Sequence, residues 1–358
     1  MMYLYILNYF TSCVVSSGIV STGDELLMIP VDVAQNSPVK LSEISEDIKK
    51  VELETTKDFL IGHIVQVVCG DDRVFVLDAQ AGSRIHVFDL SGKFLFAINK
   101  RGRGPGEYLF IKNITADKEN KHLYIVSMSN KILRYDWDGK FIDEYTRVEF
   151  PEYACFENDL LHVFLYAPGR QASEHTFANT TVQVRYTRDW QPVDTMLVKS
   201  VILSSNAGTV LPNIDFISQD NRNNLFLYYP VLLNEPFARD TLYILDNNRQ
   251  KPYIKLKFSD ENNTKRNKNI FFISRTSHLL IAKYYSFAEK VYKYFCYDFR
   301  TKTGKNMTEG FIDDIFKTGF TEIRLLNNRY FYFVKETEIS DDITLEPNPT
   351  LFIGKFKE

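Results

Sequence analysis

The sequence contains few cysteines. Four occur in 358 residues, and no two are spaced like the cysteine pairs that hold zinc. Four are also too few for the disulfide framework of a small secreted domain. Cys69, Cys155 and Cys296 each lie in an apolar, strand-like segment. This context favours buried, inert thiols.

The chain also lacks an excess of charge of one sign and a long hydrophobic run. Lys and Arg total 43 and Asp and Glu total 46, so the formal net charge is −3. Nothing in this balance favours binding to nucleic acid or to an anionic membrane surface. After residue 13, no segment reaches the ~18 consecutive apolar residues that a membrane-spanning helix needs. We therefore expect no nucleic-acid partner, and contact with a membrane only through an N-terminal lipid anchor.

Short motifs of common catalytic and phosphate-binding sites are absent as well. There is no G-x-x-x-x-G-K-[ST], no H-E-x-x-H and no G-x-S-x-G. The six histidines are scattered, and His86, His122 and His162 lie within apolar segments, where a hydrogen-bonded structural histidine is the simpler interpretation. The lack of a catalytic constellation favours a binding protein over an enzyme, and we name no catalytic residue.

Aromatic residues are abundant, with 28 Phe and 21 Tyr. Such residues favour strands, and short apolar runs separated by polar turns recur from His63 onward. The clearest copies of this repeat span Asp71 to Phe96 and Asn120 to Asp143. Four copies have an aspartate at the end of the predicted third strand, at intervals of roughly 50 residues. These aspartates are Asp89, Asp136, Asp246 and Asp298.

A repeat of this length with four strands is typical of a β-propeller blade. Six copies predict an all-β, six-bladed β-propeller that forms a single domain over residues 39–358. The sixth copy ends with its third strand, near residues 350–356, which would leave an open sheet edge. We expect residues 48–54 to supply the missing fourth strand of the last blade and to close the ring.

The chain begins with a short apolar stretch that ends in F-T-S-C at Cys13. A hydrophobic run followed by small residues and a cysteine is how a bacterial lipoprotein signal ends, although no Lys or Arg precedes this one. We expect residues 1–13 to be such a signal with Cys13 as the lipidation site, and residues 14–38 to be a tether. Removal of residues 1–36 is then expected to leave a folded propeller.

The segment K-R-G-R-G-P-G-E-Y, residues 100–108, predicts a tight irregular loop between two strands. In a propeller, loops that join one blade's outer strand to the next blade's inner strand gather around the channel mouth. Guanidinium groups and an aromatic ring on a rigid loop are suited to binding a small molecule, a glycan or a protein. The alternative interpretation is that Arg103 and Glu107 pair with each other or cap backbone groups, and that the loop is only structural. The candidate ligand-binding residues are Arg101, Arg103, Glu107, Tyr108 and, from the neighbouring connection, His63.

Three segments together resemble the six-bladed β-propeller family of exported Bacteroidetes lipoproteins, which is related to the NHL-repeat propellers. They are the G-R-G-P-G-E-Y loop, the opening L-S-E-I-S-E-D-I-K-K-V-E-L-E and the turn F-D-L-S-G-K-F. The resemblance covers residues 39–358 and is only architectural after Phe150. It implies a propeller outside the cytoplasm, in the periplasm or at the outer membrane, and it implies no particular activity.

We predict a non-catalytic propeller that binds a ligand or a protein on the loop face at the channel mouth, without a cofactor. The alternative is a divalent-metal-dependent hydrolase or lyase, similar to propeller lactonases, with its site in the central channel. Four aspartates near predicted inner strands would be candidate Ca²⁺ ligands there, although turn aspartates are a simpler interpretation. They are Asp72, Asp117, Asp215 and Asp220. The hypotheses differ in whether three or more carboxylate, Asn or His side chains converge in the channel.

Overall fold

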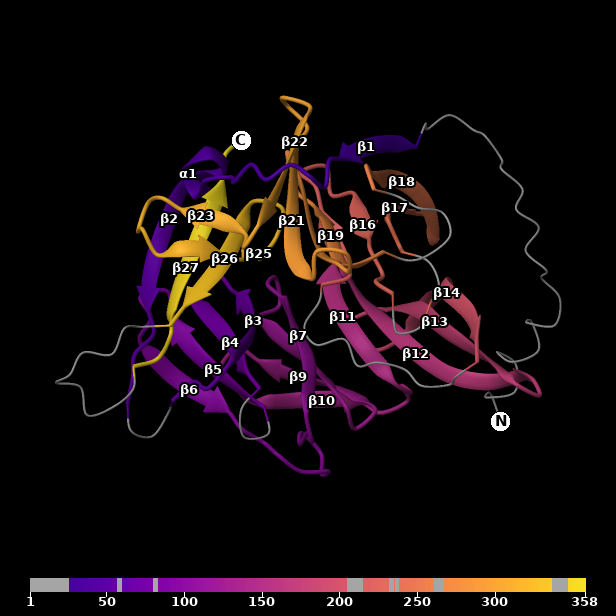
Figure 1. The fold of residues 1–358 in the computed structure, drawn as a ribbon. Helices are drawn as coiled ribbons and strands as arrows, with labels where there is room; N and C mark the ends of the chain where they lie inside the picture. The colour runs from indigo at the N-terminus through magenta and orange to yellow at the C-terminus, as the bar shows by residue number, and fades with distance from the viewer. Residues whose placement is uncertain are drawn as a thin grey trace.

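The computed structural model describes residues 26–56, 60–79, 83–204, 215–231, 235, 238–260, 267–336 and 347–358. In these residues nearly all regular structure is β-strand, and six sheets are arranged as the blades of a propeller (Figure 1). The prediction of an all-β, six-bladed propeller is confirmed. None of the helices described here is long and apolar enough to cross a membrane.

In each blade four antiparallel strands run outward from the channel, in chain order except in the last blade, whose outermost strand is β2 from the N-terminal part of the chain. The strands of the first three blades are β3 (Ile64–Cys69), β4 (Arg73–Asp78), β5 (Arg84–Asp89), β6 (Phe94–Ile98), β7 (Ile111–Asp117), β8 (His122–Ser127), β9 (Lys131–Asp136), β10 (Phe141–Tyr145), β11 (Pro151–Glu157), β12 (Leu160–Ser173), β13 (Thr176–Tyr186) and β14 (Pro192–Leu203). Those of the last three are β15 (Ile217–Gln219), β16 (Leu225–Leu227), β17 (Thr241–Asp246), β18 (Arg249–Phe258), β19 (Lys268–Arg275), β20 (Leu279–Ser286), β21 (Val291–Asp298), β22 (Thr303–Thr308), β25 (Arg324–Leu325), β26 (Tyr330–Lys335), β27 (Thr350–Phe356) and β2 (Ser45–Glu52). A small sheet of β23 (Phe311–Asp313) and β24 (Gly319–Thr321) follows the fifth blade.

The burial of each strand follows from its position in the blade. In β4 and β8 every residue after the first is buried, because these strands are covered by neighbouring blades on both faces. The outermost strand β6 alternates between half-buried and exposed residues over most of its length. Continuous apolar runs in the sequence therefore mark the middle strands, and alternating runs mark the outer ones.

The aspartates that mark the repeat end β5, β9, β17 and β21. Asp89 Oδ1 accepts hydrogen bonds from the backbone N–H groups of Ser91 and Lys93, at 2.8 and 3.1 Å. Asp136 Oδ1 accepts the two equivalent bonds in the second blade, at 3.0 and 2.8 Å. Each carboxylate thus caps the turn from the third strand to the fourth. Asp298 accepts the Arg300 N–H in the fifth blade, at 2.8 Å, whereas Asp246 pairs with the Lys251 side chain. The turn cap therefore accounts for the aspartate in three of the four blades.

The ring is closed by β2, which is the outermost strand of the last blade. It pairs antiparallel with β27, from Ser45 opposite Phe356 to Glu52 opposite Thr350. The prediction that an N-terminal strand completes the last blade is confirmed, with the strand at residues 45–52 instead of 48–54. Residues from the two ends of the propeller domain therefore share one sheet, and the partner of β2 lies about three hundred residues away in the chain.

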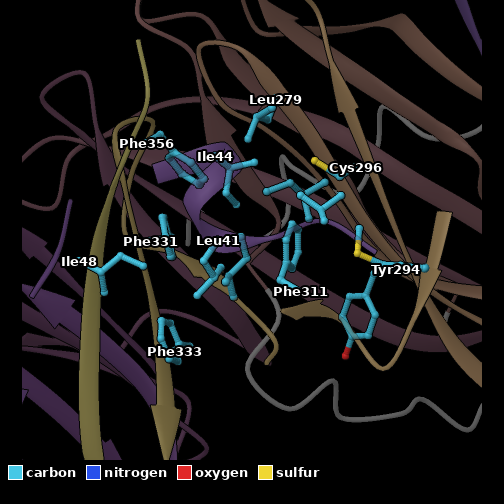
Figure 2. Close-up of a cluster of buried hydrophobic side chains, with 14 of the residues drawn as sticks. Leu41, Ile44, Ile48, Leu279, Tyr294, Cys296, Phe311, Phe331, Phe333 and Phe356 are labelled. Carbon is cyan, nitrogen blue, oxygen red and sulfur yellow. The ribbon is translucent and has the colours of Figure 1, made fainter. Parts of the chain in front are cut away.

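A hydrophobic cluster between the last two blades anchors this closing segment (Figure 2). Leu41 and Ile44 of the short helix α1 (Leu41–Ile44) pack with Phe331 and Phe356 of the last blade and with Leu279 of the fifth. Full burial of a Leu or Ile side chain contributes roughly 1.5–3 kcal/mol. The helix therefore stabilises ring closure in addition to the backbone pairing of β2.

The expected tether, residues 14–38, contains a strand. β1 (Leu27–Val31) pairs parallel with β18 at the outer edge of the fourth blade (Figure 1), and Ile29 and Val31 are each only 1% exposed. Farther along, the Ser37 N–H donates to the Asn306 carbonyl of the fifth blade, at 2.7 Å. These residues belong to the propeller, not to a tether. The sequence does not reveal this because L-M-I-P-V has no clear alternation and its partner lies more than two hundred residues away. Cys13 lies outside the described residues, so its lipidation stays a prediction.

Candidate functional site

The loop at residues 100–108 is braced by its own backbone. The Gly102 N–H donates to the Tyr108 carbonyl at 3.0 Å, and the Tyr108 N–H donates to the Lys100 carbonyl at 2.9 Å. Glu107 Oε2 accepts the Gly104 N–H at 2.8 Å, and a Cβ on Gly102 would approach the same carboxylate oxygen within 2.0 Å. Glu107 therefore organises the loop, and its role in ligand binding stays a prediction.

Tyr108 is a core residue. It is fully buried between the first two blades, and its hydroxyl donates to the Ile98 carbonyl at 2.8 Å. Burial raises the pKa of Tyr108 to about 12. The expectation that its ring faces a ligand at the channel mouth is wrong. The sequence suggested exposure because Tyr108 follows three loop glycines, but the loop turns back and returns the side chain to the core.

Arg101, Arg103 and His63 are exposed. In the described part of the chain, no ion pair joins Arg103 to Glu107. Glu107 instead caps the Gly104 N–H, which the structural alternative also allowed. None of these three residues lines the main cavity of the molecule. Their role in binding stays a prediction about the face on which the connecting loops lie.

A cavity opens at the opposite end of the channel. The connecting loops precede the inner strands, whereas the cavity surrounds the ends of these strands and the turns that follow them. Its volume is about 500 Å³, which is within the range of small-molecule sites. Residues from the inner strands of all six blades line it, so it lies in the central channel. Its polar lining includes Gln66, Cys69, Asn113, Thr115, Asp117, Lys118, Glu119, Glu157, Asn158, Asp159, Arg188, Asp215, Ser218, Gln219, Ser274, Asn327 and Asn328.

Side chains join neighbouring inner strands around this cavity. The Gln66 amide accepts the Ile114 N–H at 2.8 Å and donates to the Ile114 carbonyl at 3.0 Å, which links β3 to β7. The Asn113 amide makes the same pair of bonds with Ala154 of β11, at 2.9 and 2.8 Å. Inner strands of different blades cannot share a ladder, so these amides satisfy backbone groups that would otherwise be unpaired. Both amides are therefore already used in hydrogen bonds that hold neighbouring blades together.

Arg188 gathers three carboxylates at the cavity mouth. It lies in the turn between β13 and β14. Its Nε donates to Asp117 at 2.6 Å, and its Nη2 donates to Glu119 at 2.8 Å and to Asp159 at 2.9 Å. The guanidinium also lies 5.1 Å from the centre of the Phe156 ring. Burial by itself would raise the pKa of Asp117, but the bonds from Arg188 and Asn120 outweigh it, and the net pKa lies below its usual value.

The carboxyl groups of Glu157 and Asp215 have raised pKa values, unlike that of Asp117. Burial raises the pKa of Glu157 to about 7, against a lowering effect of Lys118. It raises the pKa of Asp215 to about 6, against a lowering effect of Arg324. Both carboxyl groups line the cavity. They therefore titrate near neutral pH in a partly enclosed space, which is frequent at functional sites.

The four candidate Ca²⁺ ligands do not act together. Asp117 is bound by Arg188, and Asp220 caps its own turn by accepting the N–H groups of Arg222 and Asn224 at 2.9 and 3.0 Å. Asp72 pairs with its neighbour Arg73, and only Asp215 is left facing the cavity. Over the described ranges, no group of three or more His, Cys, Asp or Glu residues has the geometry to hold a metal ion.

The cysteines behave as their context indicates. Cys155 and Cys296 are buried and Cys69 is half-buried, and all three are free thiols. Burial raises the pKa of Cys69 to about 11 and that of Cys296 to about 12. Thiols with such values are almost entirely protonated at neutral pH and are poor nucleophiles.

Sequence reasoning missed Arg188 and Glu157. A usable signal exists, because Cys69, Asp117, Glu157 and Gln219 are the last residues of four successive inner strands. Alignment of the repeats on this position, instead of on the turn aspartate, would have identified one wall of the cavity. Arg188 would still have been hidden, since it comes from a turn between outer strands.

The fold is a six-bladed β-propeller with a cavity in its central channel. The family follows from the sequence. The family model of the DUF4934 domain, described as a domain of unknown function, matches residues 26–353, and the chain belongs to this family. No curated protein matches it.

A solved structure shows the same fold. A Bacteroides fragilis protein that is proposed to be exported has a TM-score of 0.65 and 16% identity, over 92% of this chain and 100% of that one. At this identity the likeness shows the fold alone. The structure of U3-55K matches with a TM-score of 0.45 and 12% identity, over 89% of this chain and 100% of that one, and supports no functional argument.

Proposed function

We propose that this chain is an exported, non-catalytic propeller that binds a ligand in its channel cavity. Export is supported by the Bacteroides fragilis protein of the same fold, which is itself proposed to be exported, and by the apolar opening that ends at Cys13. Lipidation at Cys13 would anchor the propeller in the periplasm or at the outer membrane. The four-stranded repeat also supports a relationship to NHL-type propellers.

The channel cavity is the observation that carries the binding role. It combines a volume of about 500 Å³ with a lining drawn from all six blades, so a ligand there would contact the whole ring. This position differs from the loop face on which the sequence suggested binding. That face, with Arg101, Arg103 and His63, stays a separate candidate surface for a protein partner.

The test is ligand-dependent thermal stability with a blocked cavity. A ligand at one hundred times its Kd stabilises the folded state by about 2.7 kcal/mol, which is about 3–4 °C for a chain of this length. A panel of amines, glycans, peptides and metal ions should contain compounds that produce such a shift. Gln219→Trp places a large ring at the cavity wall and should abolish the ligand-induced shift in Tm.

Leu95→Trp is the matched control, because Leu95 is 42% exposed on the outer strand β6. It should leave the ligand-induced shift intact. A shift that survives Gln219→Trp would place the ligand elsewhere and contradict the proposal. Absence of a shift with every member of the panel would also count against it.

A further inference from the structure

Most polar side chains of the cavity wall are engaged in holding the propeller together. Gln66 and Asn113 bridge inner strands, as described above. Thr115 Oγ1 accepts the Phe156 N–H at 3.0 Å, and Ser218 Oγ accepts the Arg275 N–H at 2.9 Å. Because these donors and acceptors already have partners, they contribute little to the selection of a ligand.

The charged groups at the cavity mouth also have partners within the protein. Asp117, Glu119 and Asp159 all accept hydrogen bonds from Arg188. Three carboxylates around one guanidinium leave a negative balance, so the mouth attracts cations. Lys118 adds one exposed positive charge beside it.

Glu157 and Asp215 are the exceptions. Within the described residues, neither carboxyl group takes part in a hydrogen bond or an ion pair, although both line the cavity. Ser274, which is only 8% exposed, also lines it, and no partner within those residues engages its hydroxyl. The unengaged polar groups of the wall are therefore dominated by two acids.

These two acids lie around the same part of the cavity. Burial raises the pKa of the Cys155 thiol, and the charges of Glu157 and Asp215 raise it further. Burial also raises the pKa of Tyr153, with contributions from Cys155, Asp215 and Glu157. Electrostatic effects of this kind need short distances through a low-dielectric interior. Both carboxyl groups therefore lie close to Tyr153 and Cys155.

We propose that the cavity binds a small organic cation, whose ammonium or guanidinium group is neutralised by Glu157 and Asp215. The inference rests on the proposed function and names its ligand class. Two partly buried carboxylates that make no direct ion pair are costly to ionise, and a bound cation reduces that cost. Its N–H groups would also supply the donors that the two acids and Ser274 lack. A bare metal ion fits less well, because in the described chain no three ligating groups converge.

The proposal implies pH-dependent binding. The groups facing Glu157 are Lys118, Tyr153 and Cys155, and those facing Asp215 are Arg324, Tyr332, Tyr153 and Cys155. With the pKa of Glu157 near 7, most of this group is ionised at pH 8 and very little at pH 5.5. Binding of a cation should therefore weaken tenfold or more as the pH falls across this range.

The experiment measures binding of putrescine and arginine by calorimetry at pH 8 and pH 5.5. Butanediol, which has the chain of putrescine without its charges, and CaCl₂ serve as comparison ligands. Glu157→Gln and Asp215→Asn should each weaken binding at pH 8 by tenfold or more, and Glu157→Gln should flatten the pH dependence. Glu52→Gln is the control, since Glu52 is exposed on β2 and makes only a surface pair with Lys50.

Three results overturn the inference in distinguishable ways. If only CaCl₂ binds, or only an uncharged ligand, the cation assignment fails while the proposed function survives. If putrescine or arginine binds equally well to Glu157→Gln and Asp215→Asn, the site lies elsewhere, and both statements fail for this cavity. If no ligand of this set or of the wider panel binds, the proposed function fails too. Should either variant unfold, retention of binding by the other decides the question.

Discussion

Replacement of Arg188 by methionine should destabilise the propeller through the carboxylate it leaves behind. Asp117 is 1% exposed, and without Arg188 its charge would be buried with only hydrogen bonds from Asn120, at 3.3 and 3.1 Å. Removal of one partner from a buried pair costs roughly 3–5 kcal/mol. Because the Arg188 side chain is 29% exposed, we expect a smaller cost, about 2–4 kcal/mol. For a chain of this length that lowers the Tm by about 3–5 °C.

The sign of the pH dependence gives a second readout. In the native protein the pKa of Asp117 is lowered, so its contribution to stability is present above its unfolded pKa and is lost as the pH falls through the folded pKa. In Arg188→Met, burial is no longer opposed, and the pKa of Asp117 should rise above its unfolded value. The Tm difference between the two proteins should therefore shrink from pH 7 to about pH 4, as Asp117 becomes protonated.

Arg185→Met provides the matched control for these measurements. Arg185 pairs with Asp194 in the same hairpin, but this carboxylate is 24% exposed, and water can solvate it when the arginine is removed. We expect a loss of about 1 kcal/mol or less, without a strong change between pH 7 and pH 4. Equal Tm losses for both variants, or a constant difference for Arg188→Met across this range, would refute the argument from buried charge.

Three further predictions use the same thermal measurement or simple fractionation. Removal of residues 1–36 should lower the Tm by roughly 4–8 °C, because the buried side chains of Ile29 and Val31 each contribute about 1.5–3 kcal/mol. Removal of residues 1–25 should leave the Tm unchanged, and equal stability of the two truncated proteins would contradict a structural role of β1. Tyr108→Phe should cost about 1 kcal/mol by leaving the Ile98 carbonyl without its donor, while Arg103→Ala should change stability by less than about 0.5 kcal/mol; the reverse order would be inconsistent with the geometry of the loop. Cys13→Ala should move the protein from the membrane fraction to the soluble fraction, and unchanged fractionation would count against lipidation.

The fold could be predicted because its determinants repeat. Each blade must bury its middle strands on both faces and must turn after its third strand, so the same apolar runs and the same capping aspartate return, as at Asp89 and Asp136. Ring closure was predictable from the missing strand alone, since an open edge is unfavourable. β1 was not predictable in this way. The fourth blade is complete without it, and no vacancy in the repeat required a fifth strand.

The loop at residues 100–108 shows why the site was harder to predict than the fold. Its glycines and arginines indicated an irregular, charged and accessible segment, and Arg101 and Arg103 are indeed exposed. The direction of each neighbouring side chain depends on how the loop folds back, and this placed Tyr108 in the core and used Glu107 to hold Gly104. Composition predicts that a loop is polar, but it does not predict which of its groups remain free.

Comparison between blades separates structural positions from candidate functional ones without any related sequence. The residue that ends the third strand is aspartate in four blades, and at Asp89, Asp136 and Asp298 it accepts backbone N–H groups of the following turn. The residue that ends the inner strand differs from blade to blade, as Cys69, Asp117, Glu157 and Gln219 show. A position that the fold does not need to keep constant can be used for something else. Asp117 is committed to Arg188, whereas Glu157 has no ion-pair or hydrogen-bond partner in the described chain, and the proposal of a cationic ligand rests on this difference.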